Sequence, residues 1–241
     1  AAVQEAQQPY FQPQPAVPQQ QQSAPLIIVD IGAEGRREVT KRRERAQAPP
    51  SHIPFFTIVS AVAIVTIYCF ELAKSTSIAF PARQPWLWGA VATDTLTEIG
   101  AKHGTLIVEN GHWWRLFTPA FMHVSLIHII LCMFALLRVG IGLERSYGSV
   151  RIALLYFISA VAANVLSSIF TYTQISCGSS GALFGFMGLV LVDLIHNWKV
   201  IQHPARSLFM MLISIVISFA VGLLPGVDNF AHIGGFIVGL L

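Results

Sequence analysis

The sequence predicts an all-α polytopic membrane protein. Of its 241 residues, 54% are hydrophobic and only 11% are charged, whereas a soluble domain carries about 25% charged residues. The mean hydropathy is +0.61. Several uncharged runs are long enough to cross a bilayer, which takes about 20 residues of helix. The fold class therefore follows from composition and from the spacing of the charges.

The first part of the chain, residues 1–51, is expected to be a disordered cytosolic tail ahead of a membrane domain at residues 52–241. Residues 1–22 contain nine Gln and four Pro, a low-complexity composition with no pattern that forms a core. The segment RREVTKRRER (36–45) holds six Arg or Lys. A basic run just before a hydrophobic segment is typical of a topology determinant, so no nucleic-acid partner is predicted.

The uncharged runs predict five full spans and the start of a sixth. These runs lie at residues 53–70, 116–137, 152–192, 207–227 and 229–241. The third run has 41 residues and must hold two spans, divided at the polar break TYTQISCGSSG (171–181). The final run has 13 residues, fewer than the about 20 that cross a bilayer, so we expect the sixth helix to be truncated and the domain to be incomplete at its C-terminus.

The positive charges predict the orientation. With a cytosolic N-terminus, 11 Lys or Arg lie on the inner side and 4 on the outer side, as the positive-inside rule expects. The first outer loop, about residues 74–115, is long and carries four Trp. Because Trp favours the membrane interface, we expect this loop to lie partly in the outer headgroup layer, where it could serve only as an anchor.

Polar side chains within the spans gather in one half of the bilayer. Span 2 carries His123 and His128 in its outer half, span 4 begins with Ser179 and Ser180, and span 6 carries His232 near its start. Even-numbered spans run in the same direction, so these side chains share one depth. Polar groups at membrane depth are costly and usually face the protein interior.

This grouping suits acyl chemistry. A serine needs a base, and a neutral imidazole is the usual one; the free backbone N–H groups at a helix start can stabilise an oxyanion. Two small-xxx-small patterns would let spans 4 and 6 approach closely and bring Ser180 within reach of His232. They are Gly181-x-x-x-Gly185 and Gly235-x-x-x-Gly239. Each signal has a structural explanation of its own, and only the combination favours catalysis.

Five short motifs, in order along the chain, resemble those of the rhomboid family of intramembrane serine proteases, from about residue 53 to the end. GSSG (178–181) matches the G-x-S-G motif, and AHIGG (231–235) matches the motif of the sixth helix. VDNFAHIGGF is most similar to eukaryotic secretory-pathway members. The other three motifs are the WR pair Trp114-Arg115, the paired histidines of HVSLIH (123–128), and GIGLERSYGS (140–149), with Gly140, Glu144 and Gly148 in a G-x-x-x-E-x-x-x-G pattern.

The resemblance implies a rhomboid-like six-helix bundle with Ser180 as nucleophile, His232 as base, and Ser179 as a variable small spacer. Substrates would be single-span membrane proteins that enter laterally and are cut near the outer or lumenal face, without metal or cofactor. His128 would help to bind the oxyanion, and Phe184 would pack on the ring of His232. The remaining motif residues are expected to be structural: His123, Trp114, Arg115, Glu144, Gly178, Gly181, Gly185, Gly235 and Gly239.

One position departs from the family pattern. Cys132 stands where the family usually has an Asn that helps to bind the oxyanion. A thiol is a weak donor, and loss of one oxyanion donor costs about 10²–10³ in rate in other serine proteases. We therefore expect reduced or substrate-dependent activity. A buried structural cysteine is inert, so Cys132 is not expected to be the nucleophile. The three cysteines form no paired or CxxC pattern, which predicts neither a disulfide framework nor a metal site.

Two other classes of function stay open. A proteolytically silent relative would bind membrane clients and control their trafficking; loss of Ser180 or His232 would favour it, but both are present. A channel or transporter would use the histidines as a proton or metal relay, although zinc wants three or four ligands in closed geometry. The predicted location is the secretory pathway or plasma membrane, ahead of the mitochondrial inner membrane. Oligomeric state and substrate identity are not encoded in any motif.

Overall fold

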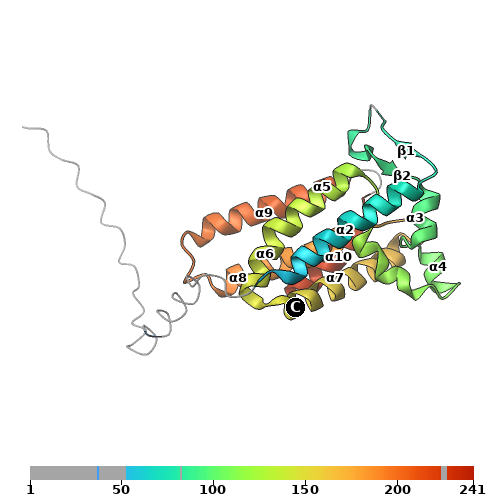
Figure 1. Ribbon diagram of the computed structural model, residues 1–241. Helices are drawn as coiled ribbons and strands as arrows, with labels where there is room; N and C mark the ends of the chain where they lie inside the picture. Colours follow the sequence, from blue (N-terminus) through green and yellow to red (C-terminus); the bar gives the residue numbers. More distant parts are fainter. Residues whose placement is uncertain (1–36, 38–52, 82, 224–226) are drawn as a thin grey trace, which may run out of the picture. The chain divides into compact units, whose positions relative to one another are not determined.

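The computed structural model describes residue 37 and residues 53–81, 83–223 and 227–241. Apart from Arg37, the tail predicted to be disordered therefore lies outside the described residues. The described residues from 53 to 241 belong to one compact unit. Within this unit the described residues are mainly helical, with one small sheet (Figure 1).

Among the described residues, six helical segments overlap the predicted spans, and the all-α polytopic class is confirmed; the second segment, Leu126–Tyr147, begins and ends later than the uncharged run 116–137 that predicted it. Four are long and apolar enough to cross a membrane, and two are shorter apolar helices. The second segment is continuous from Leu126 to Tyr147 and contains a π-helical turn. The segments are α2 (Phe55–Lys74), α5 (Leu126–Ala135) with η4 (Leu136–Gly140) and α6 (Ile141–Tyr147), α7 (Ser149–Phe170), α8 (Ser180–His196), α9 (Pro204–Val221) and α10 (Asn229–Leu240).

The long first loop is folded. Its two strands pair antiparallel, with Ile78 opposite Val91 and Ala79 opposite Ala90. The Tyr68 hydroxyl of α2 donates to the Gly89 carbonyl at 2.8 Å and holds the second strand against the helices. The loop elements are β1 (Ile78–Ala79), η1 (Pro85–Leu87), β2 (Ala90–Val91), α3 (Thr93–Ile99), α4 (Gly104–Val108), η2 (Trp113–Leu116) and η3 (Thr118–Phe121).

Glu144 joins the second and first spans. The start of α2 has no side-chain cap of its own. The Glu144 carboxylate instead accepts the backbone N–H groups of Phe56 and Thr57, each at 2.7 Å. A carboxylate at a helix N-terminus satisfies free N–H groups and complements the helix dipole. Gly148, with φ of +86°, then turns the chain directly into α7, a conformation that favours glycine.

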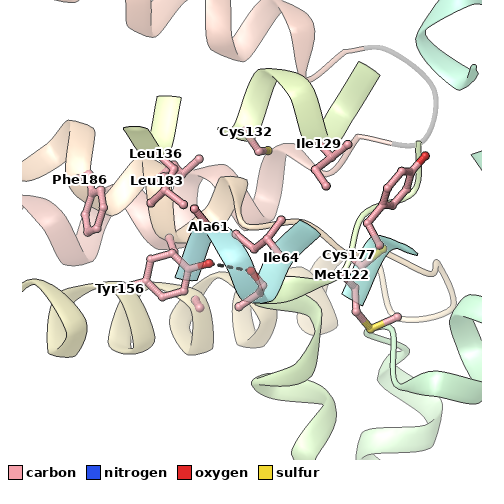
Figure 2. Packing of buried hydrophobic residues seen from close by; sticks show 14 of the residues in the cluster. Ala61, Ile64, Met122, Ile129, Cys132, Leu136, Tyr156, Cys177, Leu183 and Phe186 are labelled. Atoms are coloured by element: carbon pink, nitrogen blue, oxygen red, sulfur yellow. Dashed lines mark hydrogen bonds between the residues drawn. The ribbon is translucent and has the colours of Figure 1, made fainter. Parts of the chain in front are cut away.

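The apolar core lies between α2, the second span, α7 and α8. Ile64, Leu136, Ile152, Tyr156 and Phe186 are fully buried there (Figure 2). The Tyr156 hydroxyl donates to the Ala120 carbonyl at 2.7 Å, so the largest of these side chains has its polar atom satisfied. This core attaches the end of the first loop to α7.

Glycines bring α8 and α10 into backbone contact. A Cβ at Gly235 would overlap the carbonyl oxygen of Gly181, and one at Gly239 would overlap that of Gly185. On its other side, α8 meets α7, because a Cβ at Gly185 would overlap the Ser159 side chain. Small residues permit this approach in membrane helices. The two patterns noted in the sequence therefore lie against each other.

Candidate active site

The turn before α8 needs a glycine. Gly178 has φ of +152°, which side chains rarely adopt, and a Cβ there would lie 2.5 Å from Cε1 of His128. Ser179 is the N-cap residue and Ser180 is the first residue of the helix. The Ser180 backbone N–H is thus one of the N-terminal groups that have no partner within the helix. The turn places this N–H and the Ser180 hydroxyl beside the His128 ring.

Ser180 and His232 meet across the α8–α10 contact. Nε2 of His232 lies 3.0 Å from Oγ of Ser180. The His232 ring stacks on Phe184, with ring centroids 4.2 Å apart and planes at 14°. Phe184 lies one helical turn after Ser180, so the same helix holds both the hydroxyl and the surface on which the imidazole rests.

Asn229 orients the imidazole from its other side. Its Oδ1 lies 3.2 Å from Nδ1 of His232, and its Nδ2 donates to the Phe219 carbonyl of α9 at 3.2 Å. This second bond assigns the amide orientation, so Nδ1 of His232 carries the hydrogen. Nε2 is then the free acceptor that faces Ser180.

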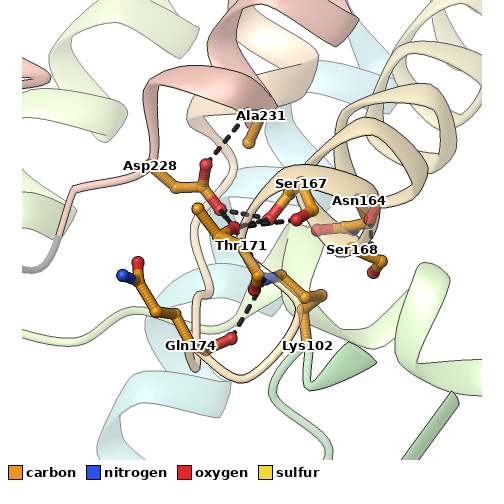
Figure 3. A network of polar contacts seen from close by, with 8 residues as sticks. All are labelled: Lys102, Asn164, Ser167, Ser168, Thr171, Gln174, Asp228 and Ala231. Atoms are coloured by element: carbon orange, nitrogen blue, oxygen red, sulfur yellow. Dashed lines mark hydrogen bonds and ion pairs between the residues drawn. The ribbon is translucent and has the colours of Figure 1, made fainter. Parts of the chain in front are cut away.

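The start of α10 is held by a polar network (Figure 3). Asp228 caps the helix by accepting the Ala231 N–H at 3.1 Å, and it also accepts from the Ser167 hydroxyl of α7. Lys102 of the first loop lies 3.9 Å from the Asp228 carboxylate. Its ammonium donates to the carbonyls of Thr171 and Gln174 at 2.9 and 3.0 Å. The network connects the first loop, α7 and the helix that carries His232.

Lys102 is fully buried, which nothing in the sequence signalled. Burial lowers the pKa of its ammonium, and the Asp228 carboxylate partly offsets that shift. The partners of Lys102 come from a loop about seventy residues away in sequence, so its role depends on the tertiary fold. A charged residue in a loop sequence usually predicts only a solvated position.

His123, His128 and Cys132 lie together on the other side of Ser180. The His123 and His128 rings are 5.1 Å apart, and the Cys132 thiol faces the Ser179 side chain and the Ser180 backbone N–H. One ring nitrogen from each histidine and the Cys132 sulfur lie within 4.8 Å of one another. These three side chains are the group, among the described residues, that could hold a metal ion, although the sequence predicted no metal site.

Ser179 does more than separate its neighbours. It is fully buried, and its hydroxyl lies 3.2 Å from Nε2 of His123. Ser179 therefore makes a hydrogen bond that the sequence analysis did not assign to it. The hydrogen bond joins the segment before α5 to the segment before α8.

A cavity reaches the site between α7, α8 and α10. Its lining includes His128, Asn164, Ser176, Ser180 and Asp228. The Ser180 hydroxyl is therefore open to a space with polar walls, whereas the residues that follow it, Gly181 to Phe186, are buried. Water and a peptide carbonyl need such a space to reach a nucleophile.

The WR pair supports the first loop. The Arg115 guanidinium is buried and donates from Nη1 to the carbonyls of Thr97 and Ala101, both at 2.8 Å. Burial lowers the pKa of Arg115. Trp114 is 41% exposed and stacks on His112, with centroids 4.5 Å apart. Neither residue contacts Ser180, so both belong to the loop scaffold.

Glu71 is a second buried ionisable residue, directly after the uncharged run 53–70. It is fully buried in α2, and its Oε2 accepts the His123 N–H at 3.3 Å. Its Oε1 is buried without a hydrogen-bond partner among the described residues. An ionisable residue inside a span is a signal of function or positioning, and here it supports the segment that carries His123.

The site combines four chemical groups. They are the Ser180 hydroxyl, the His232 imidazole paired with it, the N-terminus of α8, and the His128 imidazole at the cavity. This set can support attack on a carbonyl and stabilisation of the resulting oxyanion. The residues singled out from the sequence for this site are all at the cavity or directly beside it. Of the motif residues in the first loop and second span, Trp114, Arg115 and Glu144 lie in the scaffold, whereas His128 lines the cavity.

Comparison with known proteins identifies relatives of the chain. A protein-family model described as "Rhomboid domain" matches residues 110–241. This stretch is more than half of the chain and includes α5 to α10.

Three similar proteins differ in what their names say about activity. "RHOMBOID-like protein 1" of Arabidopsis thaliana is 44% identical over 147 residues, which are 61% of this chain and 38% of that protein. "Rhomboid-type serine protease 2" of Emericella nidulans is 40% identical over 129 residues, 53% of this chain and 26% of that protein. "Inactive RHOMBOID-like protein 8" of Arabidopsis thaliana is 33% identical over 146 residues, 61% of this chain and 42% of that protein. The chain spans about half or less of the length of the curated relatives it matches.

Proposed function

The chain belongs to the rhomboid family, and from this premise we propose that it is an intramembrane serine endopeptidase in which Ser180 is the nucleophile and His232 the base. The observation that carries the proposal is the 3.0 Å contact between Oγ of Ser180 and Nε2 of His232. A nucleophile within hydrogen-bond reach of a base, with the base oriented by a third group, is the general signature of covalent catalysis by serine.

In the first half-reaction, Oγ of Ser180 attacks the carbonyl carbon of the scissile peptide bond while its proton passes to Nε2 of His232. The carbonyl becomes a tetrahedral oxyanion. His232 then returns the proton to the leaving nitrogen as the C–N bond breaks, which leaves an acyl ester on Ser180. Phe184 and Asn229 keep the imidazole plane and its tautomer in place through these proton transfers.

The oxyanion would be bound by the Ser180 backbone N–H and by His128. The Ser180 N–H lies at the turn that Gly178 makes possible, and the His128 ring of α5 lies against that turn. Cys132 is the weak member of this group because a thiol donates poorly. We propose that this substitution slows acylation without abolishing it.

In the second half-reaction, a water molecule enters through the cavity and His232 takes one of its protons. The hydroxide attacks the acyl carbon, and the proton on His232 goes to the Ser180 oxygen as the ester bond breaks. The peptide acid is released and the hydroxyl is restored. These steps use only groups of this chain, water and the substrate.

The proposed substrates are single-span membrane proteins cut near the outer or lumenal face. The positive charges support this placement through a cytosolic N-terminus. A site in the membrane half that holds Ser180 and His232 then faces away from the cytosol. We place the protein in the secretory pathway or plasma membrane.

A client-binding role without proteolysis is the alternative. Two observations favour it: the family contains a relative named inactive, and Cys132 replaces the amide donor expected beside the nucleophile. The presence of both Ser180 and His232 at hydrogen-bond distance favours the enzyme.

The test is cleavage of a panel of single-span reporters by the full-length protein reconstituted in liposomes. The wild type should cut at least one reporter, and Ser180→Ala and His232→Ala should reduce the rate by about 10³-fold or more. Labelling by a fluorophosphonate probe should be lost in Ser180→Ala.

Ser214→Ala is the matched serine control, because Ser214 is exposed on α9 and bonds only to the Met210 carbonyl of its own helix. It should cut at the wild-type rate. If the wild type cuts none of the reporters that an active relative cuts, while it still binds them, the client-binding role replaces the enzyme.

A further inference from the structure

The side-chain group His123, His128 and Cys132 has no complete explanation in the proposed reaction. His128 has a role at the oxyanion and the Cys132 thiol faces the Ser180 N–H, but His123 takes no part in the proposed reaction. The three side chains nevertheless converge, with one nitrogen from each ring and the sulfur within 4.8 Å of one another. We call them the His-His-Cys cluster.

The cluster has the local geometry of a metal site. Cys132 is four positions after His128 in α5 (Leu126–Ala135), so the two side chains lie on one face of the helix, one turn apart. Paired ligands at this spacing on a helix are the arrangement by which helices hold zinc in other proteins. His123 joins them from the segment just before the helix.

The imidazoles have unused ligand capacity. Nδ1 of His123 and Nδ1 of His128 are buried without a hydrogen-bond partner among the described residues. A buried polar atom without a partner costs free energy. Each ring therefore has one nitrogen that no hydrogen bond uses among the described residues, and neutral imidazole is a common metal ligand.

We propose that the His-His-Cys cluster is a binding site for Zn²⁺ and that the ion inhibits the enzyme. Two imidazoles and a thiolate suit zinc and not Mg²⁺ or Ca²⁺, which prefer oxygen ligands. In tetrahedral geometry the ligand atoms stand about 3.3–3.6 Å apart. Side-chain movements of roughly 1 Å would therefore close the cluster around the ion.

Three protein ligands leave one coordination position open. The ion can enter the His-His-Cys cluster from the cavity, because His128 lines that cavity together with Ser180. The Cys132 thiol loses its proton on binding, so zinc binding releases a proton.

The inhibitory consequence rests on the proposed function. An ion held by His128 occupies the imidazole that would otherwise face the oxyanion, so the oxyanion loses that donor. The family's usual Asn at position 132 would remove the thiolate. The residue that weakens the oxyanion site is therefore also the one that makes it sensitive to zinc.

Zinc binding is measured first, without reference to activity. The purified full-length protein in detergent is titrated with Zn²⁺ against a chromophoric chelator, and separately with Co²⁺, whose absorption reports thiolate ligation. One site per chain with a cobalt–thiolate band is expected, together with a higher melting temperature in the presence of Zn²⁺. Cys132→Ser should lose the band and weaken Zn²⁺ binding by more than the roughly 10–100-fold that follows loss of an outer-sphere partner.

Cys69→Ser is the matched control, since Cys69 is an exposed cysteine outside the cluster; it should bind Zn²⁺ as the wild type does. Cys132→Asn provides a second variant in case Cys132→Ser does not fold. Equal zinc binding by the wild type and a folded Cys132 variant would mean that the ion is held elsewhere, and the proposal would be overturned.

Inhibition is measured second, on reporter cleavage. Zn²⁺ should stop the wild type, a chelator should restore it, and Cys132→Asn should cut in the presence of Zn²⁺. Binding with no inhibition would overturn the regulatory part alone. A protein that binds Zn²⁺ through Cys132 and cuts nothing even after chelation would leave the metal site standing and contradict the proposed function.

Discussion

Helices α8 and α9 are neighbours of similar length, but they differ in how much of each helix is buried. In α8, every residue from Gly181 to Phe186 is buried. In α9, none of the eighteen residues of Pro204–Val221 is buried. Both helices are strongly apolar, so hydrophobicity does not distinguish them. The difference is that α8 carries small residues facing α7 and α10, whereas α9 presents large side chains to the bilayer.

The difference between α8 and α9 explains how the candidate site can be both rigid and accessible within a membrane. Apolar burial does not drive helix association in lipid, so close packing must come from small residues and polar contacts. The α7–α8–α10 group has both, and it holds Ser180 and His232. Helix α9 has few such contacts and borders the same site through Phe219, whose ring lies 4.9 Å from that of Phe184.

The largest difference in the free energy of unfolding is expected between two leucine truncations, one in α8 and one in α9. Leu183 of α8 is 6% exposed and Leu212 of α9 is 46% exposed. Leu183→Ala should lower the free energy of unfolding by about 2–5 kcal/mol, because it leaves a cavity. Leu212→Ala should change it by no more than about 0.5 kcal/mol. Reversible unfolding in mixed micelles measures both, and equal losses would remove the distinction between the helices.

The α8–α10 contact should tolerate no added methyl group. Gly235→Ala would drive its Cβ into the Gly181 carbonyl and should cost about 3 kcal/mol, with loss of reporter cleavage. Gly142→Ala is the control, since nothing lies within 4 Å of a Cβ there; it should be neutral or stabilise slightly. The melting temperatures of the two variants are compared with that of the wild type. An unchanged melting temperature for Gly235→Ala would mean that α8 and α10 can move apart to accept the methyl group.

Part of this arrangement could be predicted from sequence. Composition and charge spacing are local properties, and they predicted the six helical segments and the break before α8. The direction of the even-numbered spans placed Ser180, His128 and His232 at one depth. Their contact could not be derived, because it depends on how α8 and α10 pack. The motif resemblance supplied that step.

Other features had no usable signal. Lys102 and Glu71 are charged residues whose partners lie far away in sequence, so composition predicts solvated positions for them. Arg138 and Arg145 were assigned to an inner segment after span 2, but they lie within the continuous helical segment Leu126–Tyr147. Only Gly148 separates that segment from α7, so the inner connection is much shorter than the charges suggested.

Lys102→Met should destabilise the junction between the first loop and α10. It removes the ammonium that donates to the Thr171 and Gln174 carbonyls; the Thr171 carbonyl keeps the Gln174 N–H, so the expected cost of about 1–3 kcal/mol comes mainly from the Gln174 carbonyl. Lys74→Met is the control, because Lys74 forms only an exposed ion pair with Glu98 and should change stability by less than about 1 kcal/mol. Thermal unfolding compares them, and similar losses would argue against a buried role for Lys102.

The same lysine predicts a pH dependence. Burial lowers the pKa of Lys102 below its ordinary value of 10.5, so the unfolded chain binds this proton more tightly than the folded one. Stability should therefore increase as the pH rises from the lowered folded pKa towards 10.5. Lys102→Met should lack this increase. A parallel pH dependence in the two proteins would show that another group is responsible.

The smallest effect is expected from a mutation at the contact between α9 and the α7–α8–α10 group. Asn229 bonds to His232 through Oδ1 and to the Phe219 carbonyl of α9 through Nδ2, so the orientation of the base depends partly on the position of α9. Asn229→Ala removes one neutral hydrogen bond to the imidazole, worth about 0.5–1.5 kcal/mol. That corresponds to a loss of about 2- to 10-fold in kcat.

If Asn229 only positions the base, kcat should fall and KM should stay the same, and fluorophosphonate labelling of Ser180 should slow by the same factor. Phe219→Ala alters the ring that packs on Phe184 but leaves the backbone carbonyl that Asn229 uses. It should therefore change KM more than kcat, because the ring borders the side where α9 meets lipid. If Asn229→Ala instead changes KM alone, the residue serves substrate access, and the base is held in place by Phe184 and the α8–α10 packing without help from α9.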